Sequence, residues 1–426
     1  MQKRAGNLAR SGQITTAHGV INTPAYIAPA TKATLKALSN EDALEASSQV
    51  MMMNTYHLML EPGADVVEKA GGLHRFSGWQ GPIMTDSGGF QAFSLGEAMG
   101  TGISKFTSWA KPSDAGSPVS TSVGIREDDY RPSQNPKKAV FDDDGVNFFS
   151  HIDGSKKRIT PESSIQTQTR LGSDIMFVFD ECVSPNAPRE AHISAIERTR
   201  LWAERCLVEH LEPKVPSGTL GSGALFGIVQ GGRYEDLRRQ SAKQISSMGL
   251  ARPDGSRGGF DGFGIGGSFV KEDMGTAVRF VCEELPEDKP RHLLGVGEPP
   301  DIFEMVENGI DTFDCVASTR KARTGALYTK TGAINVTNAK YREHFAPIES
   351  DCTCTTCQPR DGRAPYTCAY LHHLFRAHEL VAFKLASVHN LHFITNLTAQ
   401  IRTAILDGSF KEYKVAFLTR YTNSVI

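Results

Sequence analysis

The chain has 426 residues with 39% hydrophobic and 22% charged side chains, values typical of a soluble globular protein with ample core. A net charge of −2 argues against a protein wrapped in nucleic acid, but it leaves room for a local basic patch. No apolar run is long enough to span a membrane, and no apolar signal segment follows the first residues. We therefore expect a cytoplasmic protein with no membrane partner.

The first 330 residues alternate short apolar strands with helices. The expected strands lie at 19–27, 50–54, 81–85, 174–179, 224–229, 262–265, 292–294 and 310–314. The expected helices lie at 33–46, 161–171, 190–211, 234–248, 273–285 and 300–308. Such alternation indicates parallel strands, and about eight units in this length favour an α/β fold of the (β/α)8 TIM-barrel type over an open sheet.

Two regions depart from this alternation of strands and helices. Residues 105–144 are rich in Pro, Ser, Gly, Asp and Lys, which indicates a flexible insertion. After residue 340 a cysteine cluster is followed by expected helices at 369–385 and 396–407. We predict a catalytic barrel over 1–340, with its insertion near 105–144, and a metal-bearing subdomain over 341–426 that packs on the barrel.

The expected strands end in polar residues or glycine. In a parallel barrel these ends meet at one mouth, where the active site lies. The residues that would face this mouth are Asp86, Asp180, Gln230, Gly267, Gly295 and Asp314. A capped helix or a tight turn explains most of them singly, so their recurrence, rather than any one motif, predicts a site.

Asp314 closes one apolar run, and three cations follow it within ten residues: Arg320, Lys321 and Arg323. A carboxylate at the end of a buried strand can act as an acid, a base or a nucleophile, and nearby cations can hold a polyanion against it. The alternative is a helix-capping aspartate followed by a solvated basic loop.

A second constellation follows the strand at 81–85. Gly88 and Gly89 would let a flat ligand approach the backbone, and Phe90 offers a ring to stack on it. A tight strand-to-helix turn with an aspartate or serine cap is equally consistent with these residues. Asp180 and Gln230 together suit the edge of a purine, with strand-end capping as the alternative.

Three cysteines, Cys352, Cys354 and Cys357, crowd into six residues. Such crowding in a cytosolic chain indicates a metal rather than disulfides, and zinc takes four ligands in a tetrahedron. The fourth ligand should be a downstream histidine, and the spacing does not choose among His372, His373, His378 and His389. Because no open coordination position is needed, the site is expected to be structural.

Taken together, these segments resemble the tRNA-guanine transglycosylases, also called queuine tRNA-ribosyltransferases. The matching motifs are TDSGGFQ at 85–91, FDEC at 179–182, VQGG at 229–232, GG at 266–267, LGVG at 294–297 and FDCV at 313–316. The cysteine cluster and residues 387–390 resemble the zinc motif of the same family. The resemblance covers nearly the whole chain, and only loops near 105–144, 251–259 and 358–368 look like insertions.

The resemblance implies a barrel with one structural Zn2+ and exchange of guanine at the wobble position of GUN-anticodon tRNAs for a deazaguanine, by a homodimer. It assigns the nucleophile to Asp314 and the general acid/base to Asp86. Base binding is assigned to Asp86, Ser87, Gly88, Gly89, Phe90, Asp180, Gln230 and Gly267. RNA binding is assigned to Gly295, Val296, Gly297, Thr319, Arg320, Lys321, Ala322 and Arg323. Zinc binding is assigned to Cys352, Cys354, Cys357 and His389.

Some positions depart from the family pattern. Ser318 replaces a usual proline, Glu298 replaces a lysine common in bacterial members, and Ser268 replaces a leucine. Cys182 and Val270 resemble the bacterial pattern, which favours the aminomethyl precursor preQ1 over queuine as the incoming base. One alternative function is a non-catalytic RNA-binding partner subunit, which would be expected to lack one of the two catalytic aspartates. Another is an unrelated barrel glycosidase or metal-dependent hydrolase.

Overall fold

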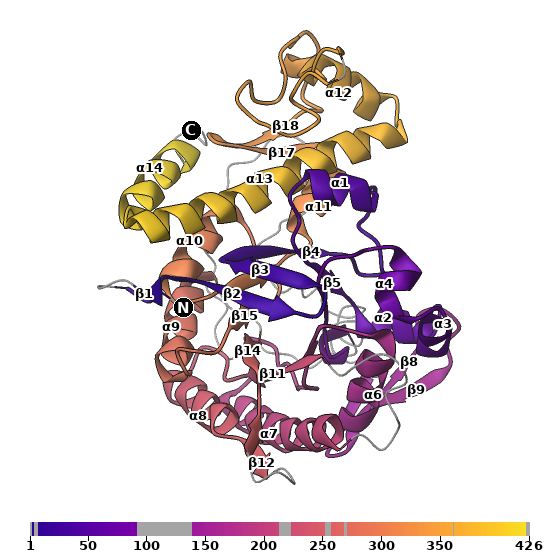
Figure 1. Ribbon diagram of the computed structural model, residues 1–426, viewed down its shortest axis with the longest axis vertical. Coiled ribbons are helices and arrows are strands. Elements are labelled where there is room, and N and C mark those ends of the chain that lie inside the picture. Colours follow the sequence, from indigo (N-terminus) through magenta and orange to yellow (C-terminus); the bar gives the residue numbers. More distant parts are fainter. Residues whose placement is uncertain are drawn as a thin grey trace.

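The computed structural model describes residues 2–3, 7–91, 139–212, 223–251, 257–267, 271–360 and 362–422. Its centre is a closed barrel of eight parallel strands that neighbour one another in chain order, which confirms the predicted (β/α)8 fold (Figure 1). The barrel strands are β4 (Ala25–Pro29), β5 (Met51–Met53), β6 (Ile83–Thr85), β10 (Ile175–Phe177), β11 (Ala224–Val229), β14 (Gly262–Ile265), β15 (Arg291–Leu293) and β16 (Thr312–Asp314).

Helices surround these strands. They are α2 (Thr55–Leu60), α3 (Ala64–Lys69), α4 (Gly72–Ser77), α6 (Pro161–Leu171), α7 (Arg189–Leu211), α8 (Glu235–Ser246), α9 (Met274–Glu284), α10 (Pro299–Glu307) and α11 (Ala317–Ala322), with a 3-10 turn, η2 (Lys271–Asp273), before α9. Local signals fix α6 at both ends: the Thr160 side chain accepts from the N–H of Ser163, Pro161 opens the helix, and Gly172 ends it with a φ of 75°.

The helix predicted at 33–46 is wrong over its first half. Only α1 (Asn40–Glu45) is helical, because Ala33 and Ala37 have φ values of 58° and 68° and so lie in the left-handed region. The apolar spacing that indicated a helix instead comes from a buried turn, in which Leu35 is only 3% exposed.

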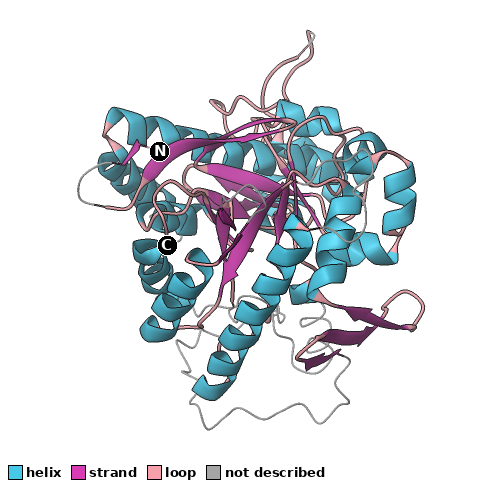
Figure 2. Cartoon of the chain, turned by 60° about the horizontal axis from the view of Figure 1, so that its bottom comes forward, coloured by secondary structure: helices cyan, strands magenta, loops and turns pink. Residues whose placement is uncertain are grey.

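The predicted insertion is also corrected where it can be seen. Residues 105–138 lie outside the described part of the chain, but β7 (Ala139–Asp142) begins directly afterwards and pairs with β8 (Gly145–Phe149). Together with β9 (Lys156–Ile159) they form an antiparallel sheet that the sequence did not predict, at the edge of the molecule in Figure 2. The alternation of buried Val146 and Phe148 with more exposed residues fixes its inner face.

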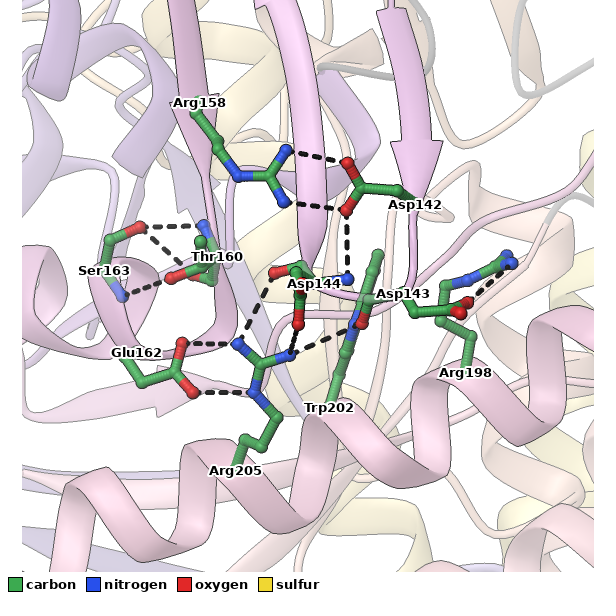
Figure 3. A network of polar contacts seen from close by, with 10 residues as sticks. All are labelled: Asp142, Asp143, Asp144, Arg158, Thr160, Glu162, Ser163, Arg198, Trp202 and Arg205. Atoms are coloured by element: carbon green, nitrogen blue, oxygen red, sulfur yellow. Dashed lines mark hydrogen bonds and ion pairs between the residues drawn. The ribbon is translucent and has the colours of Figure 1, made fainter.

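This small sheet is tied to α7 by polar contacts (Figure 3). Within the sheet, the guanidinium of Arg158 donates hydrogen bonds to both carboxylate oxygens of Asp142, at 2.8 and 2.7 Å. The indole N–H of Trp202 on α7 then donates to the carbonyl of Asp143 at 2.7 Å. The contact fixes the β7–β8 turn on the helix.

The remaining sheets lie outside the barrel. The antiparallel strands β1 (Gln2–Lys3), β2 (Arg10–Thr16) and β3 (Gly19–Thr23) form one sheet. Two hairpins are formed by β12 (Gly249–Ala251) with β13 (Arg257–Gly259) and by β17 (Ala326–Thr329) with β18 (Gly332–Asn335). The first hairpin lies where a glycine-rich insertion was expected.

The C-terminal part is more helical than predicted. After a 3-10 turn, η3 (Ala339–Tyr341), come α12 (Cys368–Arg376), α13 (Leu380–Asp407) and α14 (Phe410–Thr422). The gap predicted at 386–395 is wrong because α13 is continuous over 28 residues; the chain breaks instead at His378, where φ is 57°. Figure 1 shows α13 lying along one side of the barrel, above β4, beside α11 and beneath the β17–β18 hairpin. The domain division at residue 340 stays a prediction.

Among the described helices, none is both long and apolar enough to cross a bilayer.

Candidate active site and metal centre

A pocket opens at the carboxyl ends of the barrel strands. Its lining comprises Met52, Asp86, Ser87, Gly88, Phe90, Gln91, Phe177, Asp180, Cys182, Ile228, Gly266, Gly267, Leu294 and Asp314. The structure therefore brings together both predicted catalytic aspartates and most of the residues predicted to bind the base. Gln230 and Gly89 lie directly behind this lining, as described below.

Asp314 ends β16, and its side chain is 18% exposed. The backbone N–H of Gly295 donates to its Oδ1 at 2.8 Å, and the Nε2 of His292 lies 3.2 Å from the same oxygen. His292 was not predicted as a site residue. The sequence feature that could have identified it is a histidine within an apolar run that was expected to form a buried barrel strand.

Asp86 follows β6 and accepts hydrogen bonds at both carboxylate oxygens. Oδ1 accepts from the backbone N–H of Thr55 at 3.0 Å and of Gly88 at 3.2 Å. Oδ2 accepts from the side-chain amides of Asn54 and, at 3.1 Å, Gln91. Sequence reasoning missed Asn54 and Gln91, although both stand in the motifs that follow β5 and β6.

Asp180 and Gln230 meet across neighbouring strands, as predicted for residues that face one mouth. The Gln230 Nε2 donates to Asp180 Oδ2 at 2.6 Å, and the Ser87 hydroxyl donates to Oδ1 at 3.2 Å. Asp180 itself lines the pocket while Gln230 supports it. A glycine is required at 89 because a Cβ there would lie 2.8 Å from the Asp180 carbonyl oxygen. Gly267 lines the pocket with a φ of 101°, a conformation that favours glycine.

The segment predicted to bind RNA lies on α11, directly after Asp314. Thr319 and Ala322 are buried, whereas Arg320 is exposed. Lys321 is engaged by Glu298, at 2.7 Å. The Nη1 of Arg323 is buried and has no hydrogen-bond partner among the described residues, and burial, with Arg320 nearby, lowers the pKa of this guanidinium. A buried cationic donor of this kind can bind an anion.

The Gly-Val-Gly turn after β15 is mainly a packing element. Gly295 contacts Asp314, Val296 is 2% exposed, and a Cβ at Gly297 would lie 2.7 Å from the Cβ of Cys315. The replacement at 318 is also accommodated, because the Ser318 hydroxyl lies 2.9 Å from that of the buried Tyr26.

A buried cysteine–histidine cluster lies between the turn at 352–357 and α13. The Sγ atoms of Cys352 and Cys354 each lie 3.6 Å from His389 Nδ1, and that of Cys357 lies 3.4 Å from it. A tetrahedral zinc ion with ordinary bond lengths separates sulfur from nitrogen by about 3.6 Å. His389 Nε2 is 2.7 Å from the Tyr328 carbonyl, the kind of contact that orients a metal-binding imidazole. The four side chains fit a zinc ion, and they select His389 over the other candidate histidines.

His18, His74 and Asp174 form a second cluster at the opposite ends of the strands. His18 Nδ1 lies 2.8 Å from Asp174 Oδ1, and His74 Nε2 lies 3.2 Å from Oδ2. The two rings stack with centroids 3.5 Å apart and an interplanar angle of 16°. Nearly parallel rings cannot direct their lone pairs at one ion, so this cluster is a hydrogen-bonded clamp rather than a metal site.

Comparison with known proteins agrees with this geometry. A family model described as queuine tRNA-ribosyltransferase matches residues 5–107 and 97–423. The chain is 40% identical over 425 residues to a queuine tRNA-ribosyltransferase of Dehalococcoides mccartyi, covering 99% of this chain and 92% of the relative. It is 40% identical over 416 residues to proteins of the same name from Fusobacterium nucleatum and Lactococcus lactis, covering 97% of this chain and 95% and 93% of those relatives. The chain therefore belongs to the queuine tRNA-ribosyltransferase family of tRNA-guanine transglycosylase enzymes.

Proposed function

We propose that this enzyme exchanges guanine at the wobble position of GUN-anticodon tRNAs, those for Asp, Asn, His and Tyr, for the 7-deazaguanine preQ1 in queuosine biosynthesis. The observation that supports this most strongly is that two carboxylates, Asp86 and Asp314, line one pocket with Asp180. Two carboxylates and a recognition group for a purine edge are what a double displacement at a nucleoside requires.

In the first step, a carboxylate oxygen of Asp314 attacks C1′ of the ribose. The C1′–N9 bond breaks, its electron pair leaves with guanine, and Asp86 supplies the proton that guanine takes up. Because Asn54 and Gln91 both donate to Asp86 Oδ2, the carboxyl must give up at least one of these contacts if that oxygen carries the proton. The product is a covalent sugar ester on Asp314.

In the second step, N9 of the incoming base attacks C1′ and its proton passes to Asp86. The ester C1′–O bond breaks and its electron pair returns to the Asp314 carboxylate. Two displacements restore the original stereochemistry at C1′, as in retaining glycosidases. No nucleoside triphosphate is needed, because one N-glycosidic bond replaces another.

Recognition of the base is assigned to Asp180, which can accept from the N1–H and 2-amino groups of guanine. Gln230 holds Asp180 at 2.6 Å and keeps its carboxylate aligned. Phe90 offers a ring for stacking at the pocket, and Gly267 offers bare backbone beside it. The target nucleotide must leave its stack to reach this depth, so base flipping is part of the proposal.

The choice of preQ1 over queuine is supported by Cys182, which lines the pocket and is 4% exposed. Val270, the other residue that favours preQ1, lies outside the described part of the chain, and so does Ser268, whose smaller side chain would instead leave more room in the pocket. Competition of preQ1 and queuine against labelled guanine tests the choice, and equally tight binding of queuine would overturn it.

We further propose that the enzyme is a cytoplasmic homodimer with one structural zinc per chain. The zinc would be held by Cys352, Cys354, Cys357 and His389 and would pin the turn at 352–357 to α13. For the dimer, the support is a run of aromatic rings at the start of α12. Tyr366 stacks on Tyr370 with centroids 5.8 Å apart, and Tyr370 is 44% exposed. Exposed stacked rings of this kind can form part of a subunit contact.

The proposed activity is tested by incubating the enzyme with unmodified tRNA and labelled guanine in the absence of ATP. The wild type should incorporate label and should form an enzyme–tRNA adduct that survives a denaturing gel. Asp314→Asn should abolish both, because the nucleophile loses its charge while the side chain keeps its size. An adduct of equal yield from this variant would refute the assignment.

A further inference from the structure

A buried histidine stands directly behind the proposed nucleophile. His292 on β15 pairs in register with Thr312 on β16, two residues before Asp314, and its side chain is fully buried. Its ring nitrogens are both engaged: Nε2 lies 3.2 Å from Asp314 Oδ1 and Nδ1 lies 2.9 Å from the Thr312 hydroxyl oxygen. The ring also packs against that of Phe177, a pocket residue, with centroids 5.2 Å apart.

The chemistry of the contact with Asp314 assigns a proton to Nε2 of His292. An ionised carboxylate only accepts hydrogen bonds, so the proton that faces Asp314 sits on Nε2 of His292. The Thr312 hydroxyl can donate to Nδ1 or accept from it, so this nitrogen keeps a partner while Nε2–H donates to Asp314. Thr312, His292 and Asp314 thus form a short chain of hydrogen bonds that enters the pocket from the barrel core.

We propose that His292 is a positioning residue that holds Asp314 by Oδ1 and favours the release of the sugar ester, an inference that rests on the proposed function. Its Nε2–H acts on the same oxygen as the backbone N–H of Gly295, which donates at 2.8 Å. The carboxylate at the end of β16 is therefore oriented by two donors, one from β15 and one from the turn after it.

The two half-reactions use these donors differently. When Asp314 attacks C1′ and guanine leaves, the carboxylate loses its negative charge to the new C–O bond. When the incoming base displaces Asp314, that C–O bond breaks and the full charge returns to the carboxylate. Hydrogen bonds are stronger to a charged acceptor than to an ester oxygen. His292 therefore stabilises free enzyme relative to the adduct and assists the second displacement.

The test compares His292→Phe, which keeps an aromatic ring beside Phe177 but removes the donor, with His292→Gln, whose amide N–H can reach toward Asp314. With tRNA and a fixed guanine concentration, we expect the Phe variant to raise the ratio of covalent adduct to free enzyme about 10-fold or more. Turnover should fall by a similar factor, and the Gln variant should restore both values toward wild type. Thr312→Val, which removes the hydrogen-bond partner of His292 Nδ1, should shift the ratio in the same direction by less.

Two outcomes would overturn the proposal: wild-type adduct ratios and turnover in the Phe and Val variants, or a parallel loss of adduct and turnover, which a purely structural role predicts. Failure of the proposed function is separable, because it would appear as wild-type enzyme that neither incorporates guanine nor forms adduct. Nitrogen-15 spectra of the histidine rings test the contact without any activity. The His292 signals, assigned with the Gln variant, should report a protonated Nε2 and should move in Asp314→Ala; signals that do not move would exclude the hydrogen bond.

Discussion

The proposed role of Asp180 in recognising guanine can be tested by one isosteric change. Asp180→Asn keeps the size of the side chain but replaces a carboxylate oxygen with an N–H2 donor. In the protein this carboxylate is 8% exposed and accepts from Gln230 at 2.6 Å and from Ser87 at 3.2 Å. In the variant, an amide N–H2 group replaces one of the two carboxylate oxygens. This donor would then face another donor, either Gln230 or Ser87 or the N–H groups of guanine.

The size of the effect follows from the number of hydrogen bonds at stake. Guanine offers two donors on this edge, N1–H and the 2-amino group, whereas hypoxanthine offers N1–H alone. A hydrogen bond to a charged group contributes about 1.5–3 kcal/mol, which corresponds to about 10- to 150-fold in binding. Wild-type enzyme should therefore bind guanine about 10- to 150-fold more tightly than hypoxanthine. Asp180→Asn should lose most of this preference and raise the KM for guanine at least about 10-fold.

The assay measures the KM for labelled guanine and the inhibition constant of hypoxanthine at saturating tRNA. Asp236→Asn is the matched control, because this aspartate is 64% exposed in an ion pair with Arg189 and neither residue lines the pocket. The control should leave both constants unchanged. A variant at 180 that folds and keeps the wild-type ratio of guanine to hypoxanthine would refute the role of Asp180.

Three further changes probe the metal centre, the RNA surface and the base of the barrel. Cys354→Ala removes one of four donors, so zinc content and melting temperature should both fall; loss of zinc without loss of stability would contradict a structural role. Arg323→Ala should weaken tRNA binding and reduce its salt dependence by about one unit of slope, and an unchanged slope would argue against a phosphate contact. Asp311→Asn leaves the buried Arg10, which donates to it at 2.9 Å, without its counter-charge and should lower the unfolding free energy by about 3–5 kcal/mol. Asp65→Asn, in an exposed pair, should change it by at most about 1 kcal/mol, and equal effects of the two substitutions in urea unfolding would refute the burial argument.

Burial also explains why the Arg10–Asp311 pair is vulnerable rather than simply stabilising. Desolvation raises the pKa of the Asp311 carboxyl even though Arg10 lies against it. The attraction therefore does not fully offset the cost of removing the charge from water. Removing one partner is still expensive, because the other charge is left in the core.

The sequence by itself determined the elements that carry strong local signals. The predicted bounds of α6, β11 and β14 agree with the structure, because a capping threonine, a proline, glycines and continuous apolar runs mark their ends. The polar residues after the strands are equally local, and a closed barrel necessarily gathers them at one mouth. The three cysteines of the proposed zinc site were also predictable, since they lie within six residues, but their spacing did not select the histidine.

Other features were decided only by tertiary structure. Alanine is a strong helix former, yet Ala33 and Ala37 adopt positive φ, which costs about 1–2 kcal/mol each and persists only under surrounding contacts. Asn54 reaches Asp86 across 32 residues and His292 reaches Asp314 across 22, in each case between neighbouring barrel strands. The periodicity of a strand shows which side chains face the barrel interior and which face the helices. Which buried polar groups meet depends instead on the register between neighbouring strands. That register is set by closure of the whole barrel, so the partners of the two proposed catalytic carboxylates could be found only in three dimensions.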